Sequence, residues 1–455
     1  MKTRRRILCS LCPFVITGVG GTPAAVSFGT AVGYDAAVSA RAGRTMNIAA
    51  MRWLDRWVGT PLCLALTAVR KLADRGRRAI GRDTAAIGKS PRVLFVKLAE
   101  MGSTVLALPA IARLQELYPG ARLHYLCFAE NRAVLDLLPE IPWEGVHTVR
   151  TGSLPAFVAD VCRAVWRLRK LRMDVAIDME IFSRASAILV YLSGARVRVG
   201  MHRFRAEGLN CGDLFTHRLT YNNHRHTSAT FLSLVEALAA PAGQVPLLKK
   251  PVRPPTQLPA FHATTSERAT VLARLREGGY PGDGRGRIVI LNVNASDLVP
   301  LRRWSMDRFE ELARRCLAEY PDVYVVLTGS PAEAPIVDAF ARKLDHPRVI
   351  SMAGRTTLRE LLVLYTLSDV LITNDSGPAH FAALTPIHII SLFGPETPEL
   401  YAPLSPHAHP VTAALACSPC IHVFNYRNSP CRDNLCMKAI SADDVFAVLR
   451  PTLEP

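Results

Sequence analysis

The stretch Val370-Leu-Ile-Thr-Asn-Asp-Ser-Gly-Pro-Ala-His380 is the most informative segment of this 455-residue chain. Apolar residues typical of a strand are followed directly by polar residues around Asp375, and the pattern then predicts a helix with His380 in its first turn. A helix start leaves backbone N–H groups free, and Gly377 lets a ligand approach closely, so the turn suits the oxygens of a diphosphate. The local alternative is that Asp375 or Ser376 caps the helix and His380 is a surface histidine.

Apolar runs and helix-like stretches alternate on both sides of this turn. In the second half, the expected strands are 288–293, 323–327, 349–352, 370–373 and 387–392, with helices at 306–319, 334–344 and 358–367. In the first half, the expected strands are 92–98, 123–128, 146–149 and 174–179, with helices at 105–117, 131–138, 155–171 and 183–192. This alternation predicts two lobes, each a parallel sheet covered by helices, with a cleft at the carboxyl ends of the strands.

A proline-rich segment separates the two halves. Six prolines fall within residues 241–259, and such a segment cannot continue a helix or a central strand. We therefore expect a first lobe at 92–245, a linker at 246–260 and a second lobe at 261–455 that includes a cluster of cysteines.

The formal net charge of +17 is concentrated at the N-terminus. Residues 1–89 hold 15 Lys and Arg against 4 Asp and Glu, and the remaining 366 residues carry only +6. The sequence contains no nucleic-acid-binding motif, and its basic residues are not interleaved with aromatic residues on a folded domain. We therefore expect no nucleic-acid partner, and an anionic membrane surface is the better candidate.

Residues 1–91 form a basic N-terminal arm in this interpretation. The first 45 residues are typical either of a weak signal peptide or, as we favour, of an upstream extension before Met46 and Met51. Further on, Trp53 and Trp57 precede an uncharged stretch at 58–69, which is too short to span a bilayer, and a basic flank follows it. This order favours a segment lying in the interface of an anionic leaflet, and the alternative is a helix packed on the first lobe.

Four stretches resemble, in the same order, the motifs of glycosyltransferase family 9, the lipopolysaccharide heptosyltransferase-like group. They are VLFVKLAEMGSTVLALPAIARL (93–114), NVNASDLVPLRRWSMDRFEELARR (292–315), VVLTGSPAEA (325–334) and ITNDSGPAHFAALTPIHIISLFGPETPELYAP (372–403). The resemblance implies an α/β fold of the GT-B type, in which two Rossmann-like lobes face a central cleft. The first lobe would take the acceptor and the second the nucleotide-sugar donor.

The same resemblance implies an activity and its partners. The expected reaction is inverting transfer of a heptose-like sugar from a nucleotide-diphosphate donor, with ADP-heptose favoured, to a lipopolysaccharide or another lipid-linked glycan. No cofactor is required for catalysis. The expected location is the cytoplasm, peripheral at the inner face of the cytoplasmic membrane, and the scattered single cysteines agree with a reducing compartment.

The resemblance also carries over donor-binding residues one by one. In the second-lobe turn these are Asp375, Ser376, Gly377 and His380. A basic residue before the tryptophan of the RRW motif, Arg302 or Arg303, approaches the phosphates, with Ser296 as a nearby hydroxyl. Glu333 is expected near the nucleotide ribose.

The first-lobe turn departs from the family pattern at the catalytic position. Typical members have an aspartate as general base where this chain has Ser103, and a serine cannot accept the acceptor's proton alone. Glu100 lies in the same turn, so we assign Glu100 as the base and Ser103 as a residue that positions the acceptor. A general base is worth about a hundred- to ten-thousand-fold in rate.

Four cysteines cluster near the C-terminus. Cys417, Cys420, Cys431 and Cys436 are spaced as C-x2-C, ten residues, C-x4-C, which resembles the spacing of a structural zinc or other metal site. A labile disulfide pair and four free thiols are the alternatives.

Two other functional classes compete with the transferase interpretation. A dinucleotide-dependent oxidoreductase or epimerase is weakly supported, because the first strand–turn–helix lacks G-x-G-x-x-G. A catalytically silent GT-B homologue that acts as a binding or assembly module is motivated by Ser103. The orientation of Glu100 distinguishes the enzyme from the silent homologue: a carboxylate that faces the cleft between the lobes favours an enzyme, and one that points to solvent favours the silent homologue.

Overall fold

The computed structural model describes residues 48–79, 87–137, 143–205, 209–240, 244–282, 285–295 and 299–454. Residues 44–455 form one compact unit that holds two parallel β-sheets, which confirms the predicted two-lobed α/β fold. The interpretation of residues 1–45 and the hydroxyl of Ser296 lie outside the described residues.

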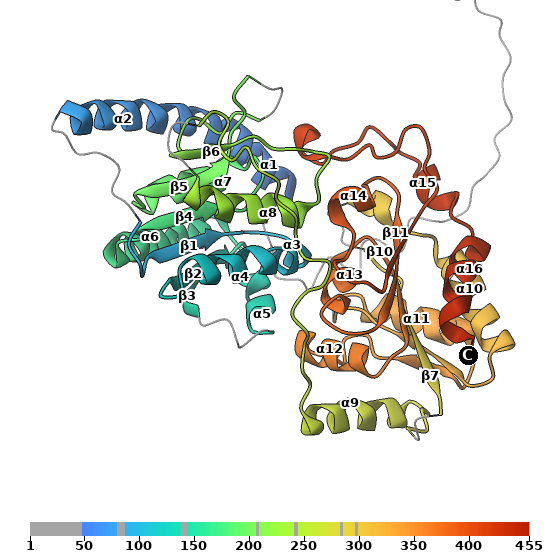
Figure 1. The fold of residues 1–455 in the computed structure, drawn as a ribbon. Helices are drawn as coiled ribbons and strands as arrows, with labels where there is room; N and C mark the ends of the chain where they lie inside the picture. The colour runs from blue at the N-terminus through green and yellow to red at the C-terminus, as the bar shows by residue number, and fades with distance from the viewer. Residues whose placement is uncertain are drawn as a thin grey trace, which may run out of the picture. The chain divides into compact units, whose positions relative to one another are not determined.

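The first lobe contains a six-stranded parallel sheet (Figure 1). In spatial order its strands are β3 (Trp143–Val149), β2 (Arg122–Phe128), β1 (Arg92–Val96), β4 (Val175–Asp178), β5 (Val197–Met201) and β6 (His217–Leu219). The order reverses beside β1, and ligands of such doubly wound sheets bind beyond the carboxyl ends of the strands at that point. Because Val96 pairs with Asp178, the residues that follow β1 and β4 share this edge.

The second lobe repeats the same topology. Its parallel strands are, in spatial order, β12 (Ala408–Thr412), β11 (His388–Phe393), β10 (Val370–Asn374), β7 (Arg287–Asn292), β8 (Val323–Leu327) and β9 (Val349–Ser351). Here the order reverses beside β7, and Thr373 of β10 pairs with Asn292 of β7. The polar turns after these two strands therefore meet at one edge.

The central strands are apolar because both of their faces are covered. All five residues of β10, and four of the five in β1, are buried. A parallel sheet with helices on both faces selects continuous apolar runs rather than alternating ones. That is why the sequence pattern identified these strands.

Three strands escaped the sequence interpretation, each for a physical reason. The edge strand β6 has only three residues, two of them half-buried, so it forms no apolar run. In the second sheet, the edge strand β12 is largely half-exposed and contains Pro410, which only an edge position tolerates. The buried strand β5 is interrupted by Arg198 and Gly200.

Helices cover both faces of the first sheet. They are α3 (Met101–Leu106), α4 (Leu108–Leu117), α5 (Arg132–Leu135), α6 (Leu154–Leu171), α7 (Arg184–Leu192) and α8 (Thr227–Glu236), preceded by α1 (Ile48–Trp57) and α2 (Gly59–Ala79). Right-handed crossovers place α4 and α6 on opposite faces. On one face α4 packs against α8, and on the other α7 packs against α1, α2 and α6.

The second sheet is covered in the same manner. Its helices are α9 (Thr265–Glu277), α10 (Met306–Glu319), α11 (Ala334–Leu344), α12 (Leu358–Thr366), α13 (Gly377–Ala382), α14 (Pro398–Tyr401), α15 (Leu435–Lys438) and α16 (Ala442–Leu453). Trp304 anchors the start of α10 in the core: it is 1% exposed, and its indole N–H donates to the Ile440 carbonyl at 2.9 Å.

The predicted interface segment forms α1 and α2, which pack on the first lobe. Gly59 lets α2 approach α7, since a Cβ there would lie 2.9 Å from Arg184 Cβ. Further along the same helix face, Cys63 is buried and Thr67 Oγ1 accepts the Asp213 N–H at 2.9 Å. Within the described part of the chain, none of the helices combines the length and apolar character needed to cross a bilayer.

Candidate active site

The second-lobe turn is fixed from below by Asn374, the last residue of β10. Its side chain is fully buried, with Oδ1 accepting the Trp304 N–H at 2.9 Å and Nδ2 donating to the Asn294 carbonyl at 3.2 Å. These bonds tie the end of β10 to the segment that follows β7. The loop before Trp304 is thereby held over the turn, a role that the sequence did not reveal.

Asp375, Arg302 and Glu396 form a buried charged cluster directly above this support. Arg302 Nη2 donates to Glu396 Oε1, and Arg302 Nε lies 3.4 Å from Asp375 Oδ2. Burial raises the pKa of both carboxyls, and Arg302 opposes the shift; the pKa of Glu396 rises to about 7. Of the two arginines considered, Arg302 therefore enters the site, while Arg303 donates to the Ala295 carbonyl.

His380 lies beside this cluster and is uncharged. It is 7% exposed, and burial, followed by the nearby His226 and Arg302, lowers its pKa to about 3. A neutral imidazole keeps one nitrogen as donor and the other as acceptor. The surface-histidine alternative is therefore wrong.

Four buried polar atoms at this edge lack a hydrogen-bond partner among the described residues. They are His380 Nδ1 and Asn294 Nδ2, together with Arg302 Nε and Asp375 Oδ2, which form an ion pair at 3.4 Å without hydrogen-bond geometry. Because more than nine in ten buried polar groups are normally satisfied, such a cluster needs an explanation. An incoming polar ligand with several oxygens would supply the missing partners.

The other predicted donor residues occupy less central places. Ser376 stands at the N-cap position of α13 but makes no capping bond; its hydroxyl donates to the Asn374 carbonyl at 3.1 Å. Glu333 lies at the turn after β8, where its carboxylate accepts the Ser330 N–H at 2.7 Å. The structure thus brings Asp375, His380 and Arg302 together and leaves Glu333 one strand away.

The first-lobe turn holds Glu100 in a strained conformation. Its backbone is left-handed, with φ 67° and ψ 85°, which costs a non-glycine residue about 1–3 kcal/mol. Its carboxylate accepts the Ser103 hydroxyl at 2.9 Å, lies 3.5 Å from Lys97 Nζ and pairs with Arg427 of the second lobe. Glu100 therefore faces the second lobe.

A second carboxylate, Glu180, lies beneath this turn, where the sequence interpretation found only Glu100. Glu180 Oε1 accepts the backbone N–H groups of Leu98 and Ala99, at 2.7 and 2.9 Å, and Lys97 Nζ at 3.0 Å. Through these bonds Glu180 holds the backbone of the first-lobe turn in place. The signal for it was its position directly after β4, which neighbours β1 in the sheet.

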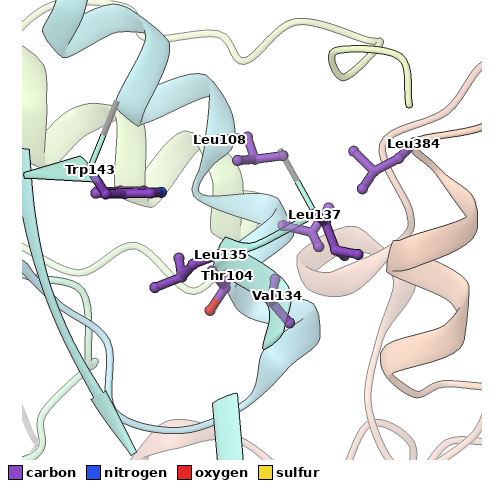
Figure 2. Close-up of a pocket in the computed structure, with 8 residues that line it drawn as sticks. Thr104, Leu108, Val134, Leu135, Leu137, Trp143 and Leu384 are labelled. Carbon is purple, nitrogen blue, oxygen red and sulfur yellow. The ribbon is translucent and has the colours of Figure 1, made fainter. Parts of the chain in front are cut away.

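The two turns touch each other. A Cβ built on Gly102 would lie 2.5 Å from His380 Cδ2 and 3.3 Å from Gly377 Cα. Nearby, a cavity of about 10 Å³ is lined by residues of both lobes. Figure 2 shows Leu384 of the second lobe opposite Leu108 and Leu137 of the first. This apolar cavity has only about the volume of one water molecule, so it is too small to be a substrate site.

The four C-terminal cysteines do not form the predicted metal centre. Among the described residues, which include all four, no group of three or more His, Cys, Asp or Glu is placed to hold a metal. Cys417 and Cys431 are exposed, whereas Cys436 is buried against Gly394, and all four are free. The spacing resembles a metal site, but the described side chains are not arranged to hold a metal ion.

Two lobes of this topology, with polar turns facing each other, define a glycosyltransferase of the GT-B class. The family model of glycosyltransferase family 9 (heptosyltransferase) matches residues 161–428. The chain therefore belongs to glycosyltransferase family 9 and is an enzyme that transfers a glycosyl group.

The relatives agree with this assignment. Over 358 residues the chain is 24% identical to lipopolysaccharide heptosyltransferase 3 of Escherichia coli, covering 76% of this chain and 95% of that protein. Among solved structures, E. coli ADP-heptose lps heptosyltransferase II superposes with a TM-score of 0.60 at 19% identity, over 80% of this chain and 98% of that one. A family 9 glycosyl transferase from Veillonella parvula DSM 2008 gives 0.60 at 18% identity, over 81% and 99%. These likenesses establish the fold.

Proposed function

We propose that this enzyme transfers a heptose-like sugar from a nucleotide diphosphate, with ADP-heptose favoured, to a lipopolysaccharide or another lipid-linked glycan. The buried Arg302–Asp375 ion pair and the unpartnered Nδ1 of His380 carry the proposal. They offer donors and an acceptor within one small region, which matches a phosphorylated sugar better than an apolar ligand. The names of the relatives favour heptose and lipopolysaccharide.

In the proposed reaction, an acceptor hydroxyl attacks the anomeric carbon of the donor sugar. The bond between that carbon and the diphosphate oxygen breaks, and the nucleoside diphosphate leaves with the electron pair. The hydroxyl proton passes to Glu100, while Arg302 offsets the charge that develops on the departing phosphate. Attack from the face opposite the leaving group inverts the anomeric centre.

Ser103 has a positioning role in this scheme. Its hydroxyl donates to Glu100 at 2.9 Å and so fixes the direction of the carboxylate. Lys97, only 2% exposed, holds Glu100 and Glu180 on the same edge of the first sheet. The proposed base thus lies in a turn whose position is fixed by contacts with the end of β1.

We also propose that 92–245 binds the acceptor and 261–455 the donor, with a linker at 246–260. Residues 244–264 contain neither helix nor strand, in keeping with their prolines. The chain has joined the second lobe by Phe261, whose N–H donates to the Leu384 carbonyl at 2.7 Å. Separate lobes for acceptor and donor require both turns to contribute to one reaction site.

The helix layer of α1, α2 and α6 is the proposed membrane-docking face, on the cytoplasmic side. Trp53 and Trp57 are 58% and 59% exposed, and Arg56 lies 5.5 Å above the Trp57 ring. On α6, Leu154, Val158 and Trp166 are spaced by four and eight residues, so their exposed side chains share one face. Apolar side chains flanked by basic ones suit an anionic leaflet.

Donor turnover tests the proposed function. Purified enzyme would be incubated with ADP-heptose, and with UDP- and GDP-sugars in parallel, in the presence of truncated lipopolysaccharide cores on vesicles. Release of ADP together with a mass gain of one heptose on the core is expected. Transfer only from a different nucleotide sugar would replace the donor assignment, and no transfer from any donor would overturn the proposal.

A further inference from the structure

The loop that joins β12 to α15 crosses to the first lobe at its tip, Tyr426 to Asn428. The Tyr426 hydroxyl accepts Arg184 Nη2 of α7 at 3.0 Å, and Asn428 Oδ1 accepts Arg52 Nη1 of α1 at 2.8 Å. Between these two anchors, Arg427 pairs with Glu100. Three first-lobe elements therefore define where this one arginine lies.

The backbone of the tip is bent to place Arg427. Tyr426 and Arg427 are consecutive left-handed residues, with φ of 55° and 56°, although neither is a glycine. Such conformations persist only where the surroundings impose them, and they cluster at ligand-binding and catalytic sites. A loop that served only to cover the surface would not need this geometry.

Arg427 is a largely buried cation at the junction of the two turns. Its side chain is 26% exposed and its guanidinium lies 6.0 Å from the centre of the Tyr401 ring. Burial, and then the nearby Arg52, lower the pKa of Arg427 to about 10, so it stays protonated at neutral pH. Two residues beyond Glu100, Gly102 abuts His380. Arg427 thus pairs with a residue of the first-lobe turn, and that turn abuts the donor turn.

The pairing of Arg427 with Glu100 conflicts with the action of Glu100 as a base. A carboxylate engaged by a guanidinium, a hydroxyl and a lysine is a weak proton acceptor, because its lone pairs already receive donors. A diphosphate is the natural competitor, since its oxygens match the planar donor fork of arginine. Exchange of partners would resolve the conflict.

We infer that Arg427 is a donor-binding residue whose place is held by Glu100 before the donor binds, so that the donor's diphosphate takes Arg427 and frees Glu100 to act as the base. The inference rests on the proposed function. In this inference Glu100 can accept a proton only when the donor is bound, because Arg427 leaves Glu100 only when a diphosphate takes its place.

The exchange makes two opposite demands on nucleotide affinity. Removing Arg427 must weaken binding of the diphosphate, by about tenfold or more for the loss of a charge-assisted contact. Removing the charge of Glu100 must strengthen it, because the competitor for Arg427 is gone. The second effect must vanish when Arg427 is absent.

Calorimetric titration of ADP and of adenosine, with UDP and GDP as alternative diphosphates, tests this. The proteins are wild type, Arg427→Ala, Arg427→Lys, Glu100→Gln and the double variant Glu100→Gln/Arg427→Ala. Arg432→Ala is the matched control, since it removes an exposed arginine from the same loop. The expected result is weaker ADP binding for Arg427→Ala, an intermediate affinity for Arg427→Lys, and tighter binding for Glu100→Gln that disappears in the double variant.

Adenosine separates a phosphate contact from a structural effect. Its affinity should be unchanged in every variant, whereas a distorted lobe would weaken adenosine and ADP alike. If wild type binds ADP and Arg427→Ala binds it equally well, the inference is overturned while the proposed function stands. If wild type binds no nucleoside diphosphate, both fall. Arg427→Lys keeps the test decisive should Arg427→Ala fail to fold.

Discussion

Gly102 of the first lobe lies directly against His380 of the second, so closely that a Cβ on Gly102 would be 2.5 Å from His380 Cδ2. The contact joins the turn that carries the proposed base to the turn that carries the proposed donor site. Only a residue without a side chain allows this approach. The two turns therefore meet, which agrees with the proposal that both contribute to one reaction site.

Gly102→Ala should separate the turns. The added methyl must displace either the buried His380 ring or the backbone at Gly377, and overpacking of this kind costs about 1–3 kcal/mol. We expect the rate of transfer to fall about tenfold or more, since that free energy is lost where the reactants are aligned. Steady-state kinetics and thermal unfolding measure the two effects.

Gly76→Ala is the matched control for this change. Gly76 lies in α2, and a Cβ added there would have no atom within 4 Å, so the same methyl meets open space. Alanine should stabilise the helix by up to about 1 kcal/mol and leave transfer unchanged. Normal kinetics for Gly102→Ala would contradict the proposed alignment of the turns.

His380→Ala should weaken donor binding without destroying the fold. The imidazole is neutral, with its pKa lowered to about 3 by burial, and Nδ1 has no partner among the described residues. Loss of one hydrogen bond to the donor predicts an affinity for ADP about three- to tenfold lower. His262→Ala, which removes an exposed histidine, is the control. Equal ADP affinity in both variants would rule out a donor contact by His380.

The sequence predicted the central strands and the second-lobe turn because their signals are local. Buried parallel strands such as β10 must be apolar on both faces, and the polar residues of the turn follow Asn374 directly in the chain. The edge strand β12 was missed because half-exposed residues give no such pattern. The local sequence pattern therefore identified the central strands of the sheets but missed edge strands such as β12.

Long-range pairs were beyond the reach of the sequence. Glu396 lies 94 residues from Arg302, and Arg427 is more than 300 residues from Glu100, yet each pair is in contact. Arg302 and Glu100 lie in motifs that the sequence identified, but no local pattern names their partners, so only the folded chain shows each pair. The cysteine spacing failed for the opposite reason: a familiar pattern in the sequence does not by itself give the described side chains the geometry of a metal site.

Glu396 should make nucleotide binding depend on pH. Burial raises its pKa to about 7, against the effect of Arg302. An incoming diphosphate disfavours the ionised form further, so binding takes up a proton and affinity falls as pH rises through about 7. Below that pH Glu396 is already protonated and affinity reaches a plateau.

Titration of ADP between pH 6 and pH 8.5 in wild type and Glu396→Gln tests this dependence. Glutamine keeps the shape and cannot ionise, and the phosphate's own titration is common to both proteins. The wild-type slope should exceed that of the variant. Parallel profiles would show that Glu396 does not titrate with the ligand.

The exposed aromatic residues of α1 and α6 should carry membrane binding. Replacing Trp53, Trp57 and Trp166 by serine removes apolar surface worth about 1.5–3 kcal/mol for each fully buried side chain, so binding to anionic vesicles should fall at least about tenfold. Sedimentation with anionic and neutral vesicles measures it. Ile336→Ser, at a 45% exposed site on the second lobe, is the control.

Point variants suit this test better than deletion of residues 1–89. Such a deletion would remove α1 and α2, and with them the buried Cys63 and the bond between Thr67 and Asp213. Loss of vesicle binding would then reflect damage to the first lobe. Unchanged sedimentation of the triple variant would show that the docking face lies elsewhere.

The proposed base yields the most direct prediction. Glu100→Gln keeps the shape of the side chain and its bond from Ser103, but an amide cannot take up the proton of the acceptor. Transfer should fall about a hundred- to ten-thousand-fold. ADP affinity should not fall, because the lost charge repels rather than attracts a diphosphate. Ser103→Ala, which removes only the orienting hydrogen bond, should cost about three- to tenfold.

Ser103→Asp in the Glu100→Gln background distinguishes a missing base from a disturbed turn. Ser103 lies within hydrogen-bonding distance of Glu100, at 2.9 Å, so a carboxylate at either position reaches the same small region. If proton acceptance is what Glu100→Gln lacks, the added aspartate should restore part of the rate, whereas a distorted turn would not recover. Single-turnover transfer with bound donor measures this step alone. Full turnover by Glu100→Gln without the second change would remove Glu100 from the mechanism and leave the proton to another group beside the acceptor.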